Sequence, residues 1–141
     1  GNQLVQVLEG GEGVRDRFLD LLHGVTLELC PTSNVQLGST VGGLAGHPLL
    51  RLHRAGFKVT INPDNRTISE TTMTGELGRA VEWMGMPLLQ RDQLSSDVLA
   101  MTENAVDAAF MPASRRSELR RRVASMLPRL QQIVSIVAPY L

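Results

Sequence analysis

The sequence has 141 residues, of which 43% are hydrophobic, and its 14 basic and 14 acidic side chains balance. This length fits one domain with a packed core, and the balanced charge gives no reason to expect binding to nucleic acid or to an acidic membrane surface. The single cysteine, Cys30, excludes an internal disulfide framework and indicates a reducing compartment. The sequence shows neither a leader nor an apolar run long enough to cross a bilayer, so we expect a soluble, cytoplasmic chain.

The first half of the sequence predicts helices and strands in alternation. Apolar residues at helical spacing predict a helix over Val14–His23, and a β-branched, alternating segment predicts a strand over Val25–Cys30. A polar loop that contains glycines is predicted over Pro31–Gly43. The segment His47–Gly56 predicts a short helix with a proline in its first turn, and Phe57–Asn62 predicts a second strand.

The second half of the sequence predicts helices only. One is expected over Glu76–Met84, after a polar segment with several possible helix caps. These caps are Ser69, Thr71, Thr72 and Thr74. Another helix is expected over Ser95–Phe110, capped by Ser95 or Ser96. Its apolar face would be formed by Leu99, Val106 and Phe110. A last helix begins near Ser114, and Pro128 is expected to bend or interrupt it. Its apolar stripe would consist of Leu119, Val123, Met126, Leu130, Val134 and Val137.

The order of these elements predicts an α/β fold. Strands that alternate with helices are typical of parallel sheets with helical crossovers. In such sheets, ligands and catalytic groups gather at the C-terminal ends of the strands. The segment CPTSN follows the first predicted strand, and NPDNR follows the second. We therefore expect any chemistry to lie in these two segments.

Asp64 and Asn65 are the most informative pair in the second segment. An Asp-Asn pair at the end of a strand is often only an Asx turn. A carboxylate next to a buried strand, however, pays a desolvation cost unless a cation or hydrogen-bond donors meet it, and a metal would satisfy it. From the residues alone, both interpretations stay open.

Other polar residues near these segments have ordinary structural interpretations. From local pattern alone, Ser33 and Asn34 belong to a capped turn, and His47 is a plain residue at a helix start. Cys30 is expected to be a buried, small apolar side chain. No two histidines have the spacing of zinc ligands, so this chain alone does not predict a complete metal site.

The segment RRSELRRR, Arg115–Arg122, concentrates positive charge. Such a run can bind phosphate groups. Leu119 and Val123 place most of its arginines on the solvent side of a helix, Glu118 interrupts the run, and no aromatic residue accompanies it. We therefore expect a solvated helix face and no contact with nucleic acid.

Four blocks of the sequence, taken in order, resemble the C-terminal part of the adenosine deaminase family. They are the segment CPTSNVQLG, the helix that begins HP, the strand end NPDNR and the late helix NAVDAAFMP. The family carries a CPTSNVQTG-like loop, an HP-starting helix, an NTDN- or NTDD-type strand end and an N-A-x-x-x-x-F-x-P helix. The resemblance covers Val25–Arg122. The strand end with its following arginine is similar to that of the bacterial, actinobacterial-like branch of the family.

This resemblance implies a zinc-dependent enzyme that hydrolyses adenosine to inosine and ammonia. The fold would be the C-terminal portion of a TIM (β/α)₈ barrel, about strands 7 and 8 with their helices. Asp64 matches the aspartate that ligates zinc and helps to orient the attacking water, and Asn65 matches the residue that hydrogen-bonds purine N7. Ser33 and Asn34 match the loop near the metal and would contact the substrate. The implied ligands are thus Zn²⁺ and a purine nucleoside.

The sequence departs from the family pattern in what it lacks. The H-x-H pair, the strand with the third histidine and the H-A-G-E-type glutamate are absent, and Pro63 stands where the family usually has Thr. We therefore expect residues 25–141 to be the C-terminal part of the barrel domain, after an atypical segment with a helix over residues 1–24. The other zinc ligands would lie in a missing N-terminal part, and the unpaired strands would associate with that part or with a second copy. The alternative is a truncated, inactive remnant that acts as an interaction or oligomerisation module.

Overall fold

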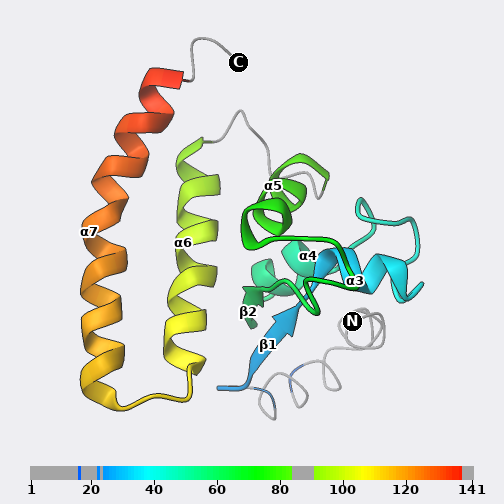
Figure 1. Cartoon of the computed structure of the whole chain (residues 1–141), viewed down its shortest axis with the longest axis horizontal. Helices are drawn as coiled ribbons and strands as arrows, with labels where there is room; N and C mark the ends of the chain where they lie inside the picture. Colours follow the sequence, from blue (N-terminus) through cyan, green and yellow to red (C-terminus); the bar gives the residue numbers. More distant parts are fainter. Residues whose placement is uncertain (1–15, 17–21, 23, 84–90, 138–141) are drawn as a thin grey trace.

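The computed structural model describes residues 16, 22, 24–83 and 91–137 of the chain (Figure 1). In chain order, the elements are β1 (Thr26–Leu29), α3 (Pro31–Gln36), α4 (Leu49–Arg54), β2 (Lys58–Ile61), α5 (Met73–Trp83), α6 (Arg91–Ala108) and α7 (Ala113–Val137). The helix predicted over Val14–His23 lies outside the described residues, except for residues 16 and 22. Both predicted strands and the helix between His47 and Gly56 are confirmed.

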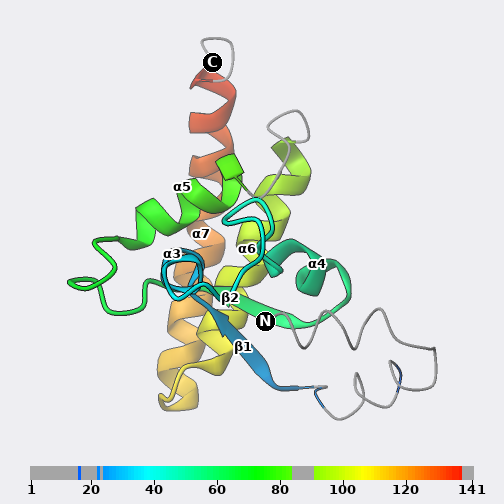
Figure 2. The same ribbon diagram turned by 90° about the vertical axis from the view of Figure 1, so that its right-hand side faces the viewer.

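The two strands form a parallel sheet, as the sequence predicted. Thr26 pairs with Lys58 at one end, and Leu29 pairs with Ile61 at the other. Three of the four residues of β2 are buried, which suits its β-branched composition. Because the strands are parallel, both end at the same edge of the sheet. The segments that lead to α3 and to α5 start from that edge (Figures 1 and 2).

Helix α3 forms where the sequence analysis predicted a loop. Pro31 occupies its first turn, where the missing N–H of a proline costs nothing, and the N–H of Asn34 donates to the carbonyl of Cys30 at 2.8 Å. The prediction of a loop over Pro31–Gly43 was therefore wrong for residues 31–36. A helix of six residues is too short to give a repeating apolar pattern, so its polar composition resembled that of a loop.

The core lies where α4 and α6 pack against the strands. Leu49 and Leu52 of α4 and Val59 of β2 have no exposed surface. Gly56 follows α4 with φ of 87°, a left-handed conformation that glycine adopts at no steric cost, and the chain then turns into β2. The buried apolar cluster consists of Leu29, Leu49, Leu50, Leu52, Phe57, Val59, Ile61, Ala80 and Met101.

Two polar side chains also attach α6 to the rest of the structure. Nδ2 of Asn104 donates to the carbonyl of Val59 in β2 at 3.0 Å. Nearer the start of α6, Oδ1 of Asp97 lies 3.1 Å from Nε2 of His53 in α4. Helix α6 is thus fixed to both neighbouring elements by hydrogen bonds as well as by apolar contact.

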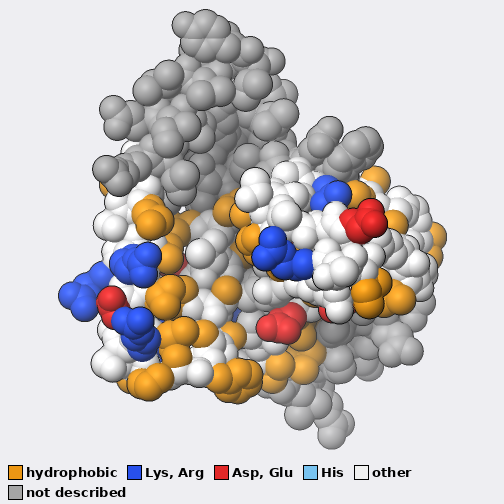
Figure 3. Space-filling model, in the orientation of Figure 1, with side chains coloured by type: hydrophobic (Ala, Val, Ile, Leu, Met, Phe, Trp, Pro, Cys, Tyr) orange, Lys and Arg blue, Asp and Glu red, His pale blue; other side chains and the backbone are white. Residues whose placement is uncertain are grey.

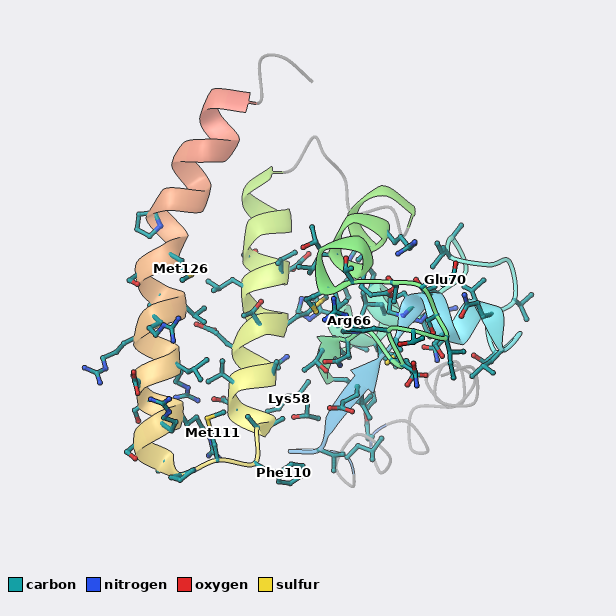
Figure 4. All side chains as sticks on the ribbon, viewed as in Figure 1. Lys58, Arg66, Glu70, Phe110, Met111 and Met126 are labelled. Atoms are coloured by element: carbon teal, nitrogen blue, oxygen red, sulfur yellow. The ribbon has the colours of Figure 1, made fainter. Side chains whose placement is uncertain are left out.

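The ends of α6 differ from the sequence prediction. The helix begins at Arg91, four residues before Ser95, so neither predicted serine caps it. Phe110 lies beyond its last residue, in the turn to α7, and is fully exposed (Figure 4). The prediction that Phe110 belongs to the apolar face was therefore wrong. The helix ends at Ala108, so the helical spacing no longer applies at Phe110. Val106, by contrast, is buried as expected.

Helix α5 begins at Met73, three residues earlier than predicted. Oγ1 of Thr72 accepts a hydrogen bond from the N–H of Gly75 at 3.1 Å, which identifies Thr72 as its cap among the four candidates. The predicted end of this helix after Trp83 lies outside the described residues. The cap matters for the site because it places Glu76 in the first turn of the helix.

Helix α7 lies beside α6 and continues through Pro128 (Figure 1). Interruption at this proline, one of the two predicted effects, does not occur. The proline cannot donate to the carbonyl of Ala124, but both residues are exposed, so water can satisfy that carbonyl. Leu119 and Val123 are half-buried, as a stripe toward α6 requires, whereas Met126 is exposed. Among the described residues, no helix is both long and apolar enough to cross a membrane.

Most of the arginine run lies on the outside of α7, as predicted. Figure 3 shows the basic side chains gathered on the surface over this helix. Arg115 donates to Glu118 at 2.8 Å, and Nε of Arg120 donates to Asp107 of α6 at 2.8 Å. These exposed ion pairs contribute little to stability. Arg116 is half-buried and donates to the carbonyls of Ala109 and Met111, and the other arginines form a solvated helix face.

Candidate functional site

The candidate site lies where the two parallel strands end. The N–H of Asn62 donates to the carbonyl of Leu29 at 2.9 Å, which continues the strand pairing one residue beyond β2. Two segments leave the sheet from here, α3 after β1 and residues 62–72 after β2. The hydroxyl of Ser33 in α3 donates to Oδ2 of Asp64 at 2.7 Å, so the structure brings together two residues that are 31 positions apart.

Asp64 is exposed, whereas Ser33 is buried. The sequence argument that Asp64 needs a cation to offset burial therefore does not apply to the described chain. Its chemistry still suits a metal, because carboxylate oxygens are ordinary zinc ligands and Ser33 donates to only one of the two. The described residues contain no group of three or more His, Cys, Asp or Glu side chains that could hold a metal ion. Asp64 thus fits the part of one ligand in a set that other residues must complete.

Asn65 forms an Asx turn through its side-chain oxygen. Oδ1 accepts hydrogen bonds from the N–H groups of Thr67 and Ile68, each at 3.1 Å. Within the described part of the chain, nothing accepts a hydrogen bond from its amide nitrogen Nδ2. An Asx turn and a binding role were the two interpretations of the pair Asp64 and Asn65. The turn uses Oδ1 of Asn65, so Nδ2 is left as a donor in the exposed segment after β2.

Asn34 contacts His47 and thereby connects α3 to the start of α4. Oδ1 of Asn34 lies 3.0 Å from Nε2 of His47, and Nδ1 of His47 accepts the N–H of Leu49 at 3.3 Å. Since Nδ1 is an acceptor, Nε2 carries the proton and donates to Asn34. His47 is only 4% exposed, and burial lowers its pKa to about 4. It is a buried, neutral connection between two elements and not the plain helix-start residue that was expected.

Cys30 lies at the same edge of the sheet and is half-buried rather than buried. Burial raises the pKa of its thiol, and the carboxylates of Asp64, Glu28 and Glu76 raise it further. A thiol in these surroundings stays protonated at neutral pH, and a protonated thiol is a poor nucleophile and a poor metal ligand. The structure therefore favours a packing role for Cys30.

Glu76 is the residue that the sequence analysis missed. Its side chain, in the first turn of α5, is completely buried. Oε2 accepts the backbone N–H of Thr32 at 3.0 Å, and Oε1 accepts the hydroxyl of Thr71 at 2.6 Å and also the hydroxyl of Thr32. Arg79 lies 3.6 Å from Oε1. The available signal was its position four residues before the buried Ala80, which puts it on the inner face of the helix.

A shallow, open hollow lies on the surface between β2 and α5. Its lining residues are Arg66, Thr67, Glu70, Thr71 and Thr72. Figure 4 shows Arg66 and Glu70 on this connecting segment. The hollow begins one residue after Asn65 and ends at the cap of α5, so the segment that bears the candidate residues is held at both ends.

Comparison with known proteins gives consistent matches. The family model described as adenosine deaminase matches residues 14–126. The adenosine deaminase of Mycobacterium tuberculosis (strain H37Rv) is 45% identical over 92 residues, which are 65% of this chain and 23% of that protein. The adenosine deaminase of Lacticaseibacillus casei is 43% identical over 100 residues, 71% of this chain and 27% of that protein. The chain thus spans about a quarter of the length of these relatives.

A solved structure is also similar. The crystal structure of adenine deaminase from Arthrobacter aurescens matches with a TM-score of 0.68 at 22% identity, and the match covers 84% of this chain and 33% of that one. At this level of identity, the likeness concerns the fold. Two parallel strands with their flanking helices therefore correspond to one part of a larger deaminase fold.

Proposed function

Because the chain belongs to the adenosine deaminase family, we propose that it forms part of an enzyme that hydrolyses adenosine to inosine and ammonia. Its fold is the C-terminal portion of a TIM (β/α)₈ barrel, about strands 7 and 8 with their helices. Active sites in this fold lie at the C-terminal ends of the strands. The hydrogen bond between Ser33 and Asp64 at that edge is the observation that supports the proposal most directly.

Asp64 is proposed as a zinc ligand. Its carboxylate stands at the end of β2, one oxygen is held by Ser33, and the other remains for a metal. When bound, zinc would act as a Lewis acid and lower the pKa of the attacking water. A chain with one ligand needs the others from elsewhere, and we propose that they come from the N-terminal part of the barrel.

Asn65 is proposed to hold purine N7. The N7 atom is a hydrogen-bond acceptor, so its partner must donate. The Asx turn occupies the amide oxygen of Asn65 and fixes the side chain. The NH₂ group is then the part of the amide that is left to donate a hydrogen bond to the substrate. This division also explains why an asparagine suits the position. An ionised aspartate could form the same turn but could not donate to N7.

Ser33 and Asn34 are proposed to act together from α3. Ser33 orients Asp64, and Asn34 fixes the first turns of α3 against His47 so that Ser33 keeps its position. Adenosine or a related purine nucleoside would then lie over the C-terminal ends of β1 and β2, close to these residues.

The test uses the complete polypeptide that contains residues 1–141. Adenosine hydrolysis is followed by ultraviolet absorbance, and bound zinc is measured by metal analysis. We expect activity that a chelator abolishes, and we expect Asp64→Ala to lose most activity and to bind zinc more weakly. Asp107→Ala, an exposed aspartate on α6, is the matched control and should behave as the unmodified protein. A polypeptide that binds no zinc and leaves adenosine intact would instead support the inactive remnant.

A further inference from the structure

The burial of Glu76 needs an explanation beyond the stability of the fold. A fully buried carboxylate costs several kcal/mol of desolvation unless donors surround it, and an apolar side chain at the same place is often at least as stable. Here the donors come from two other segments, Thr32 in α3 and Thr71 before α5, with Arg79 of α5 nearby. The cluster thus connects the segment after β1 with the segment after β2.

The contact with Thr32 fixes the direction of α3. Thr32 is the second residue of this helix, and its N–H is one of those that the helix itself leaves without a partner. Glu76 accepts this N–H and also the hydroxyl of the same residue, so it holds Thr32 through two atoms.

Ser33 follows Thr32 directly, and its hydroxyl donates to Asp64. A continuous series of contacts therefore runs from Glu76 through Thr32 and Ser33 to Asp64. Glu76 has no hydrogen bond with Asp64 among the described residues, and the contacts through Thr32 and Ser33 of α3 connect it to that carboxylate.

We propose that Glu76 is a positioning residue, which fixes Thr32 and Ser33 and thereby the orientation of the Asp64 carboxylate toward a metal. The inference rests on the proposed function, because it assumes that Asp64 is a metal ligand. It adds a residue that makes no contact with metal or substrate but tunes the affinity of the site. Partners that orient metal ligands commonly change metal affinity by about 10- to 100-fold when they are removed.

The first experiment compares Glu76→Gln with Glu103→Gln in the complete polypeptide. Glutamine keeps the shape of the side chain but has one acceptor oxygen in place of two, so the contacts with Thr32 and Thr71 cannot all persist. Glu103 is an exposed glutamate on α6 and serves as the control. We expect Glu76→Gln to raise the Kd for zinc, measured by competition with a chromogenic chelator, by up to about 10-fold, the lower end of the effect of removing a direct partner of a metal ligand. We expect kcat to fall while KM changes by less than about threefold.

Thr32→Val is the second variant, in case Glu76→Gln folds poorly. Valine keeps the shape of the threonine and removes only its hydroxyl contact with Glu76. We expect a weaker loss of zinc affinity in the same direction, and thermal melting would show that the variant stays folded. If both variants bind zinc as tightly as Glu103→Gln, the inference is wrong.

A double-mutant cycle separates positioning from general stability. If Glu76 acts through Ser33, Glu76→Gln should raise the zinc Kd much less in a Ser33→Ala background than in the unmodified protein. Equal effects in the two backgrounds would overturn the inference. Asp64→Ala distinguishes this failure from failure of the proposed function. If Asp64→Ala leaves zinc binding and activity unchanged, the site assignment itself is wrong, whatever Glu76 does.

Discussion

Nε2 of His47 donates to Oδ1 of Asn34 across 3.0 Å, and this hydrogen bond joins the start of α4 to α3. The imidazole is buried and neutral, with Nδ1 occupied by the N–H of Leu49. A proton added to Nδ1 would remove that acceptor and place a charge inside the protein. The hydrogen bond from the N–H of Leu49 therefore exists only while Nδ1 of His47 is unprotonated, whereas Nε2 can donate to Asn34 in either state.

Because of this histidine, the free energy of unfolding should decrease when the pH is lowered from neutral toward 4. The pKa of His47 is about 4 in the folded protein, below its usual value near 6.5, so the unfolded chain binds the proton more tightly. The stabilising contribution is complete above about pH 6.5 and is lost as the pH falls toward 4. Urea unfolding of the complete polypeptide at several pH values measures the loss.

His47→Gln should flatten this pH dependence, because glutamine does not titrate. His53→Gln is the control, since His53 is half-buried on the same helix and contacts Asp97 instead. If the unfolding free energy of His47→Gln falls between pH 6.5 and 4 as steeply as that of the unmodified protein, the titrating group lies elsewhere.

Asn65→Ala should separate substrate binding from metal binding. The variant loses both the amide donor to N7 and the acceptor of the Asx turn, but it keeps Asp64 and the hydrogen bond from Ser33. Zinc content should therefore stay unchanged, while kcat/KM should fall by the equivalent of about 1–3 kcal/mol of transition-state stabilisation. Metal analysis and steady-state kinetics provide both values. Loss of zinc in Asn65→Ala together with its retention in Asp64→Ala would reverse the two assignments.

Asn65→Asp should make activity depend on pH in a new way. The aspartate can still accept the N–H groups of Thr67 and Ile68, so the turn should persist. It can donate to N7 only while protonated, and activity should therefore fall as its carboxyl group ionises. A pH–rate profile identical in shape to that of the unmodified protein would show that residue 65 does not donate to the substrate.

The 141-residue chain by itself should associate and should not deaminate adenosine. Each of its two described strands has one neighbour in the sheet, so their outer edges have backbone groups that can pair with another chain. One proposed zinc ligand is too few for a catalytic site, which takes about three from the protein. Light scattering and an absorbance assay with added zinc check both points. A monomer with a cooperative melting transition, or turnover that a chelator stops, contradicts this expectation.

Leu52→Ala should destabilise the protein far more than Leu37→Ala. Leu52 is fully buried between α4 and the strands, whereas Leu37 is 76% exposed after α3. Truncation of a buried leucine costs about 2–5 kcal/mol, and an exposed one changes stability by about 0.5 kcal/mol or less. Chemical denaturation of the two variants in the complete polypeptide measures the difference. Equal losses would mean that the cluster around Leu52 is not the core.

The strands and α4 could be predicted from the sequence because their signals are local. Val25–Cys30 and Phe57–Asn62 combine β-branched residues with clear ends, and Pro48 and Gly56 mark the two ends of α4. The parallel pairing followed from their alternation with helices. The same logic led to the edge of the sheet where Ser33 and Asp64 meet.

The contacts that organise that edge could not be predicted in the same way. Glu76 meets Thr32 across 44 positions, and His47 meets Asn34 across 13, so neither partner is visible in a local pattern. A glutamate is ordinarily exposed, but three hydrogen bonds and a nearby arginine allow the burial of Glu76. Helix α3 escaped prediction because six residues carry too little periodicity.

The two polar anchors of α6 limit how the length of this helix can change during evolution. Asp97 and Asn104 are seven positions apart, which is close to two turns of about 3.6 residues, so both face the same side. An insertion or deletion of one residue between them would rotate one anchor by about 100° relative to the other. Either His53 or Val59 would then lose its partner. Natural length variation should therefore spare positions 97–104 and concentrate in the turn around Phe110, where the chain is exposed.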